Sequence, residues 1–119
     1  MNKPAVLDAM RRDLEDAATH LGRPHDLRFK AMFGGLMAYL DGKPCAWLTA
    51  GGLALKVAPA DQRTLLQLDG AARLIAKPGA APSRHFILLP AALRRDTGQL
   101  AGWLARSAAH TATKPVARR

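Results

Sequence analysis

Short alternating segments separated by glycine turns occupy the stretch from Arg28 to Val57, and this pattern constrains the fold more than any other part of the sequence. Phe29, Ala31 and Phe33 fall on every second position, as expected when one face of a strand is buried. Further along, Asp41–Gly42 is a dipeptide that tolerates the positive φ angles of a two-residue hairpin turn. The stretch therefore predicts an antiparallel meander of three or four strands.

Helical spacing marks both ends of the chain. Apolar residues recur at helical intervals from Leu7 to Leu21, and Pro4 and Gly22 suit the start and the end of this first helix. A last helix is predicted to begin after Asp96 or Thr97, because either side chain can cap it.

Three shorter elements are predicted between the meander and the last helix. They are a helix that begins near Pro59 and Asp61, a strand over Arg73–Lys77 and a strand over His85–Leu89. This order, α-β(3-4)-α-β(2)-α, predicts an α+β fold of two layers, with helices on one face of an antiparallel sheet. The predicted core consists of Leu7, Met10, Leu14, Phe29, Phe33, Tyr39, Trp47, Leu55, Leu65, Ile87, Leu89, Leu100, Trp103 and Leu104.

The length of 119 residues is that of one domain with one core. We expect residues 1–110 to form this domain and residues 111–119 to be a basic, disordered tail. No apolar run approaches the roughly 20 residues of a transmembrane helix, and no secretory signal is visible at the N-terminus. With a single cysteine no internal disulfide can form, so we expect a cytoplasmic protein that does not interact with membranes.

The net charge of +9 lies entirely in the second part of the chain. Residues 1–41 carry six Lys/Arg and six Asp/Glu, whereas residues 42–119 carry twelve and three. Such a field attracts polyanions, including nucleic acid, although an arginine-rich composition alone also accounts for it, and no aromatic residues interleave the charges along the sequence. If an anion is bound, the pair Arg94 and Arg95 is the preferred contact. The full set of candidates is Lys56, Arg73, Lys77, Arg84, Arg94 and Arg95.

No residue pattern predicts a catalytic, cofactor or metal site. Cys45 lies on a predicted strand, where a buried thiol is expected rather than a nucleophile. The four histidines lack the spacing of a ligand set. Gly34–Gly35 precedes no helix, as a phosphate-binding loop would, so a bend or bulge is the simpler reading.

A resemblance to a known family rests on a series of residues in the meander, in the order Met32, Phe33, Gly34, Gly35, Tyr39, Asp41, Gly42 and Lys56. Their order and spacing resemble the N-terminal domain of the TfoX/Sxy competence-regulator family, and the similarity extends from about Leu27 to Ser107. Pro90 and the run Trp103-Leu104-Ala105 resemble the end of that domain. The resemblance implies a bacterial cytoplasmic domain with a fold like that of secretion chaperones, and a role in regulating genes for DNA uptake.

The residues and the family resemblance are compatible with three functions. The first is a non-enzymatic regulatory or adaptor domain that binds a protein partner, or a second copy of itself, through a sheet edge or an apolar face. The alternative is direct binding of nucleic acid by the basic C-terminal half, with an affinity that falls steeply with salt. A small-ligand binder that uses the glycine-rich meander is the third and the least favoured.

Overall fold

The structure is a computed structural model that describes residues 3–22, 26–32, 34–75 and 79–113. Within these ranges the helices are α1 (Lys3–His20), α2 (Pro59–Leu66), α3 (Ala91–Arg95) and α4 (Thr97–Thr113). The strands are β1 (Leu27–Met32), β2 (Gly35–Leu40), β3 (Lys43–Thr49), β4 (Gly52–Lys56), β5 (Ala72–Arg73) and β6 (Phe86–Leu88).

The strands form one antiparallel sheet in the order β1-β2-β3-β4-β6-β5. The first four strands are the predicted meander, and the turn between β2 and β3 has φ values of 55° at Asp41 and 78° at Gly42. Both angles are positive, as a two-residue hairpin turn requires. The predicted α+β class and the antiparallel sheet are confirmed.

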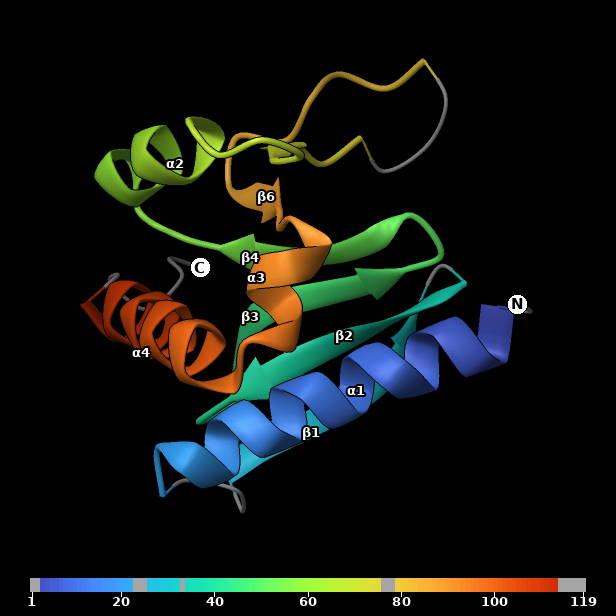
Figure 1. The fold of residues 1–119 in the computed structure, drawn as a ribbon, viewed down its shortest axis with the longest axis vertical. Coiled ribbons are helices and arrows are strands. Elements are labelled where there is room, and N and C mark those ends of the chain that lie inside the picture. Colours follow the sequence, from blue (N-terminus) through green and yellow to red (C-terminus); the bar gives the residue numbers. More distant parts are fainter. Residues whose placement is uncertain (1–2, 23–25, 33, 76–78, 114–119) are drawn as a thin grey trace, which may run out of the picture.

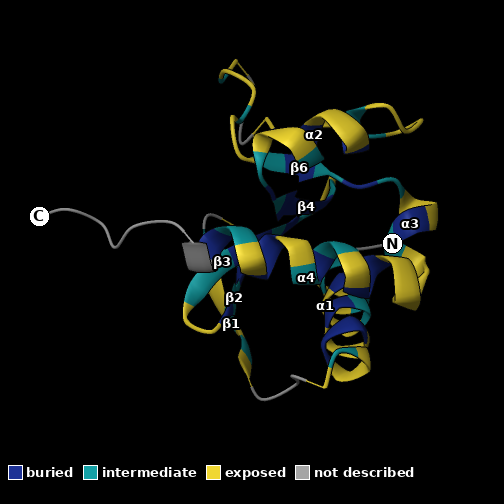
Figure 2. Cartoon of the chain, turned by 90° about the vertical axis from the view of Figure 1, so that its left-hand side faces the viewer, coloured by how far each residue is buried: buried dark blue, intermediate teal, exposed yellow. Residues whose placement is uncertain are grey.

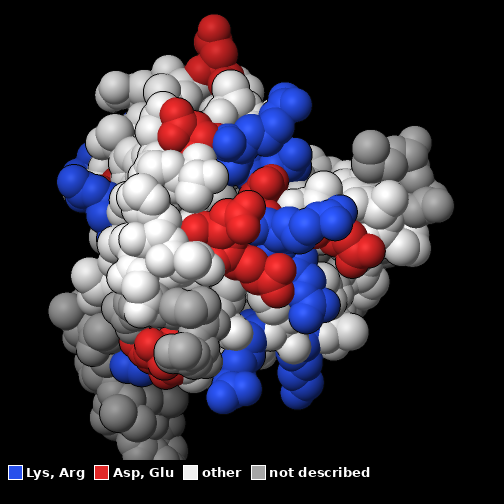
Figure 3. All heavy atoms as spheres, turned by 60° about the horizontal axis from the view of Figure 1, so that its bottom comes forward, with Lys and Arg blue, Asp and Glu red and all other residues white. Residues whose placement is uncertain are grey.

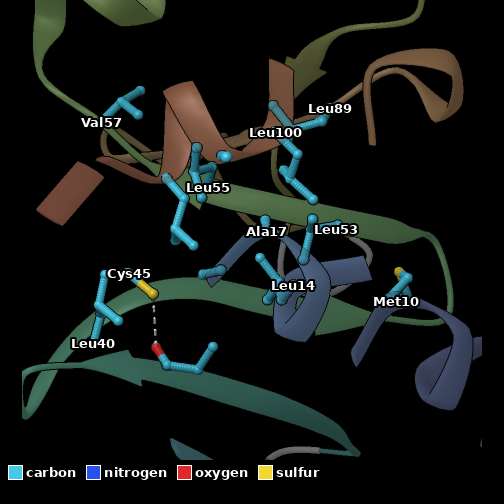
Figure 4. Packing of buried hydrophobic residues seen from close by; sticks show 14 of the residues in the cluster. Met10, Leu14, Ala17, Leu40, Cys45, Leu53, Leu55, Val57, Leu89 and Leu100 are labelled. Atoms are coloured by element: carbon cyan, nitrogen blue, oxygen red, sulfur yellow. Dashed lines mark hydrogen bonds between the residues drawn. The ribbon is translucent and has the colours of Figure 1, made fainter. Parts of the chain in front are cut away.

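A β-bulge interrupts the pairing of β2 with β3. Ala38 pairs with Ala46 and Tyr39 pairs with Pro44, so Cys45 has no partner residue on β2. Cys45 and Ala46 consequently both belong to the buried core, although they are neighbours in the chain. The Cys45 Sγ also lies 3.5 Å from the carbonyl oxygen of Ala38 (Figure 4).

One face of the sheet is covered by helices. In Figure 1 α1, α3 and α4 lie in front of the strands, and Figure 2 shows α1 and strands β1 to β3 as separate layers. Each helix contributes to the same core, through Leu14 of α1, Leu65 of α2, Leu93 of α3 and Leu100 of α4. Across from α1, Leu53 of β4 completes this layer (Figure 4).

Most of the predicted core is confirmed. Leu7, Phe29 and Trp103 are partly buried against the core, and Phe33 lies outside the described residues. The predicted residues that are buried in the core cluster are Met10, Leu14, Leu55, Leu65, Ile87, Leu89, Leu100 and Leu104.

The prediction was wrong for Tyr39 and Trp47, which do not belong to the core cluster. On β2 Ala38 and Leu40 face the helices, so Tyr39, which alternates with them, points to the other side of the sheet. On β3 the bulge at Cys45 makes Ala46 face the helices, so Trp47, the next residue, points to the other side of the sheet.

Two element boundaries differ from the prediction, and one helix was not predicted. β5 covers Ala72–Arg73, whereas the predicted strand was Arg73–Lys77, whose last two residues lie outside the described part of the chain. The short helix α3 was not predicted, since its five residues are too few to show a helical pattern. The helix α4 continues to Thr113, three residues past the expected end of the domain, and residues 114–119 lie outside the described part.

Of the two residues predicted to cap the last helix, Asp96 and Thr97, it is Asp96 that accepts from the first turn. The backbone N–H of Gln99 donates to its Oδ1 at 3.1 Å, and the Gln99 side-chain amide donates to its Oδ2 at 3.1 Å. These bonds hold the pKa of Asp96 below its ordinary value.

None of the described helices has both the length and the apolar character needed to cross a membrane.

Candidate functional site

The face of the sheet opposite the helices carries a continuous row of side chains. Strand register places one residue from each strand in this row, in the order Lys30, Met37, Trp47, Ala54, Leu88 and Ala72. A second row beside it contains Arg28, Tyr39, Lys56 and Phe86. We call these two rows the open face, because the described helices pack on the other side of the sheet.

The middle of the open face is apolar. Met37 and Ala54 are buried there without belonging to the core cluster, and Trp47 and Phe86 are half-buried. The two rings meet edge to face, with centroids 6.1 Å apart and an interplanar angle of 74°. These contacts give the open face a firm apolar centre.

Gly35 allows Trp47 to lie close to the backbone of β2. A Cβ atom at Gly35 would lie 3.3 Å from the indole Nε1 of Trp47 and 2.3 Å from the carbonyl oxygen of Leu48. Any larger residue at position 35 would therefore displace the indole ring of Trp47 or the backbone of β3 at Leu48. This glycine belongs to the motif that carried the family resemblance, and its structural role is to seat Trp47.

Cations lie next to the aromatic rings of the open face. Arg28 is directly opposite Tyr39 on the neighbouring strand, and Lys56 is directly opposite Phe86. Lys30 occupies the same row as Trp47, two strands away. None of the described strand residues is Asp or Glu, so every charged side chain in the two rows of the open face is basic.

The helical side has a different electrostatic character. Figure 3 shows acidic and basic side chains interleaved at the bottom of the view in Figure 1, where α1 runs. Arg11 pairs with Glu15 at 3.4 Å, and the Nε of Arg94 lies 2.9 Å from Oδ2 of Asp13. Burial raises the pKa of Asp13 above its ordinary value of 3.8, while the charge of Arg94 opposes this shift. Mutual neutralisation leaves this side poorly suited to attract a polyanion.

The structure does not bring the six predicted anion contacts together on one surface. Arg94 pairs with Asp13, and the Nε of its neighbour Arg95 donates to a helix carbonyl at 3.4 Å. Arg73 donates to Gln62 at 2.7 Å within the fold. Arg84 is exposed in the segment before β6, and Lys77 lies outside the described residues. Lys56 alone among the five described candidates belongs to the open face.

The family-motif residues divide into turn formers and open-face residues. Gly34 has φ 77° in the turn between β1 and β2, and Asp41 and Gly42 form the next turn. Tyr39 and Lys56 belong to the open face. Met32 lies at the end of β1, and Phe33 is outside the described residues.

Sequence reasoning missed four residues of the candidate site: Arg28, Lys30, Trp47 and Phe86. The basic residues lie in the half of the chain that is neutral overall, and the rings are far from them in sequence. Alternation within each strand was the available signal, but only the pairing register shows that the strands align these residues.

Other features of the described residues give no reactive centre. Burial raises the pKa of Cys45 to about 12, so its thiol stays protonated at neutral pH. In the part of the chain that the structure describes, no group of three His, Cys, Asp or Glu side chains could hold a metal ion. A shallow hollow between α2 and α4 is bridged by Arg106 and Asp61, whose charged atoms are 3.0 Å apart.

Comparison with protein families gives one match. The model of the TfoX N-terminal domain matches residues 19–111. This range contains the whole sheet and helices α2 and α3, together with most of α4. No curated protein and no solved structure matches the chain.

Proposed function

Because the chain belongs to the TfoX N-terminal domain family, we propose that it is a non-enzymatic, cytoplasmic regulatory domain that acts by binding a polyanionic partner on the open face. The observation that carries this proposal is the segregation of charge. Arg28, Lys30 and Lys56 surround an apolar centre on a surface without acidic strand residues, whereas Arg11, Arg94 and Arg106 on the helical side pair with carboxylates.

The character of the open face supports binding rather than catalysis. Its side chains are aromatic, aliphatic or permanently cationic at neutral pH, so none of them is suited to proton transfer there. The buried thiol of Cys45 faces the helices and cannot act as a nucleophile from the open face. A surface of this kind fits a regulator that works through its partner.

Self-association was one of the expected modes, and charge argues against it on this face. Two copies packed through their open faces would bring Arg28, Lys30 and Lys56 of each copy near the same residues of the other. Like charges facing each other across a desolvated interface cost several kcal/mol. A partner with negative charge meets the same residues favourably.

The test is a comparison of two triple variants that each lose three positive charges. Arg28→Ala/Lys30→Ala/Lys56→Ala removes the cations of the open face, and Arg12→Ala/Arg63→Ala/Arg95→Ala removes exposed cations from the helices. Fluorescence anisotropy at physiological salt would measure binding to three labelled polyanions: oligothymidylate, a DNA duplex of equal length and polyglutamate.

We expect the open-face variant to lose at least about tenfold in affinity for the polyanion that binds best, since three anion contacts are removed. The helix variant should stay within about twofold, because it changes only the distant field. An equal loss in both variants would show that net charge alone causes binding and would rule out the open face.

A further inference from the structure

We propose that the polyanion bound by the open face is single-stranded nucleic acid, with bases stacking on the aromatic rings and phosphates contacting the neighbouring cations. This inference rests on the proposed function and names the partner. It differs from the expectation drawn from sequence, which placed nucleic acid on the basic C-terminal half and found no aromatic residues among the charges.

Three of the six aromatic residues of the chain lie on the open face: Tyr39, Trp47 and Phe86. Trp47 and Phe86 touch, and Tyr39 lies one strand from Trp47 on the diagonal, two residues beyond its direct partner Met37. Diagonal neighbours on a sheet are about 7–8 Å apart. The rings thus form a series across the middle of the sheet, as a platform for successive bases requires.

Cations accompany these rings at the distance of one or two strands. Arg28 is opposite Tyr39 and Lys56 is opposite Phe86, each on a neighbouring strand about 4.8 Å away. Lys30 is two strands from Trp47, roughly 10 Å away. The alternation of ring and cation matches the alternation of base and phosphate along a single strand.

The half-buried rings favour a single strand over a duplex. Trp47 packs closely over Gly35 and against Phe86, so its accessible ring surface lies close to the sheet rather than projecting far from it. Duplex bases are already stacked and paired, and a duplex would contact the cations alone. An acidic protein segment would also contact the cations, but it offers no repeated planar groups to the rings.

Two measurements on the full chain test this proposal. A Trp103→Phe background leaves Trp47 as the only tryptophan, because the chain has two. Oligothymidylate and oligouridylate, added separately, should quench the emission of Trp47 if a base stacks on it. The comparison of the two oligonucleotides also shows whether DNA or RNA is preferred.

The second measurement is the affinity of Trp47 variants for the same oligonucleotides, read by anisotropy. We expect Trp47→Ala to bind at least about tenfold more weakly and Trp47→Phe to remain within about threefold, since phenylalanine retains a stacking ring. Trp103→Ala is the matched control and should bind like the wild type, because Trp103 lies on α4 against Arg106. Circular dichroism checks that every variant is folded, and Trp47→Phe supplies the test if Trp47→Ala is not.

The outcomes separate this inference from the proposed function. Tighter binding of single strands than of the equal-length duplex, with quenching and the Trp47 effect, supports both. Equal affinity for duplex and single strand, or preference for polyglutamate, overturns the single-strand inference if the open-face cations still matter. Binding that depends on neither the rings nor these cations overturns both proposals.

Discussion

The Arg73 guanidinium donates a hydrogen bond of 2.7 Å to the side-chain oxygen of Gln62. The amide nitrogen of the same glutamine donates to two carbonyl oxygens, those of Val57 at 2.9 Å and Arg84 at 2.8 Å. Gln62 is buried and connects α2 with the segments that flank β4 and β6. Arg73, which sequence analysis placed among the anion contacts, therefore has a structural partner inside the domain.

Replacement of this glutamine tests the importance of the connection. Gln62→Leu removes the donor to two carbonyl groups and the acceptor for Arg73, and unsatisfied buried groups cost about 1–3 kcal/mol each. We expect a loss of about 2–3 kcal/mol in the free energy of unfolding, measured by urea denaturation. Gln67→Leu, at an exposed position just after the same helix, should change it by less than about 0.5 kcal/mol. Similar losses in the two variants would contradict this role.

The sequence predicted the meander well because the signals for it are local. Asp41 and Gly42 specify their turn by backbone conformation alone, and alternation marks each strand within a few residues. The amphipathic helix at each end is likewise visible in its own spacing. Such features need no knowledge of distant parts of the chain.

The candidate site could not be predicted because it depends on pairing across strands. Lys30 and Leu88 share one row only through the successive register of β1, β2, β3, β4 and β6. A bulge of one residue at Cys45 also decides which face receives Trp47. Neither the bulge nor the strand order has a signal within a single segment.

Gly35 should tolerate no side chain. In Gly35→Ala the new methyl group would lie 2.3 Å from the carbonyl oxygen of Leu48, so backbone would have to move. We expect a loss of about 3 kcal/mol in stability, at the upper end for overpacking. Thermal denaturation followed by circular dichroism measures it. Gly51→Ala is the control, because its nearest neighbour, Oγ1 of Thr49, would lie at 3.7 Å. Equal melting temperatures for the two variants would disprove this close packing.

The contact between Arg94 and Asp13 should make stability depend on pH. Burial raises the pKa of Asp13, and Arg94, 2.9 Å away, opposes the shift. In Arg94→Ala the pKa of Asp13 in the folded state would rise further above its value in the unfolded chain. The folded state would therefore lose stability as the pH rises from the unfolded-state pKa towards the folded-state pKa. We expect a deficit of about 1–3 kcal/mol at neutral pH that shrinks in acid.

Urea denaturation of wild type and Arg94→Ala from acid to neutral pH measures this deficit. Arg63→Ala serves as the control, because Arg63 is exposed on α2 and does not contribute to the shift in the pKa of Asp13. Its deficit should be small and constant over the same range. A deficit for Arg94→Ala that grows in acid would be the opposite of the expected sign.

Cys45 should destabilise the fold in strong base. Burial raises the pKa of its thiol from 9.0 to about 12, so above pH 9 the unfolded chain loses a proton that the folded chain retains. The free energy of unfolding then falls by up to about 1.4 kcal/mol per pH unit until the folded thiol also ionises. Below pH 9 the thiol is protonated in both states and its contribution is constant.

The difference in stability between wild type and Cys45→Ala isolates this group from lysine and tyrosine titration. A difference that stays constant between pH 8 and about 11 would show that the thiol is accessible to water in the folded state.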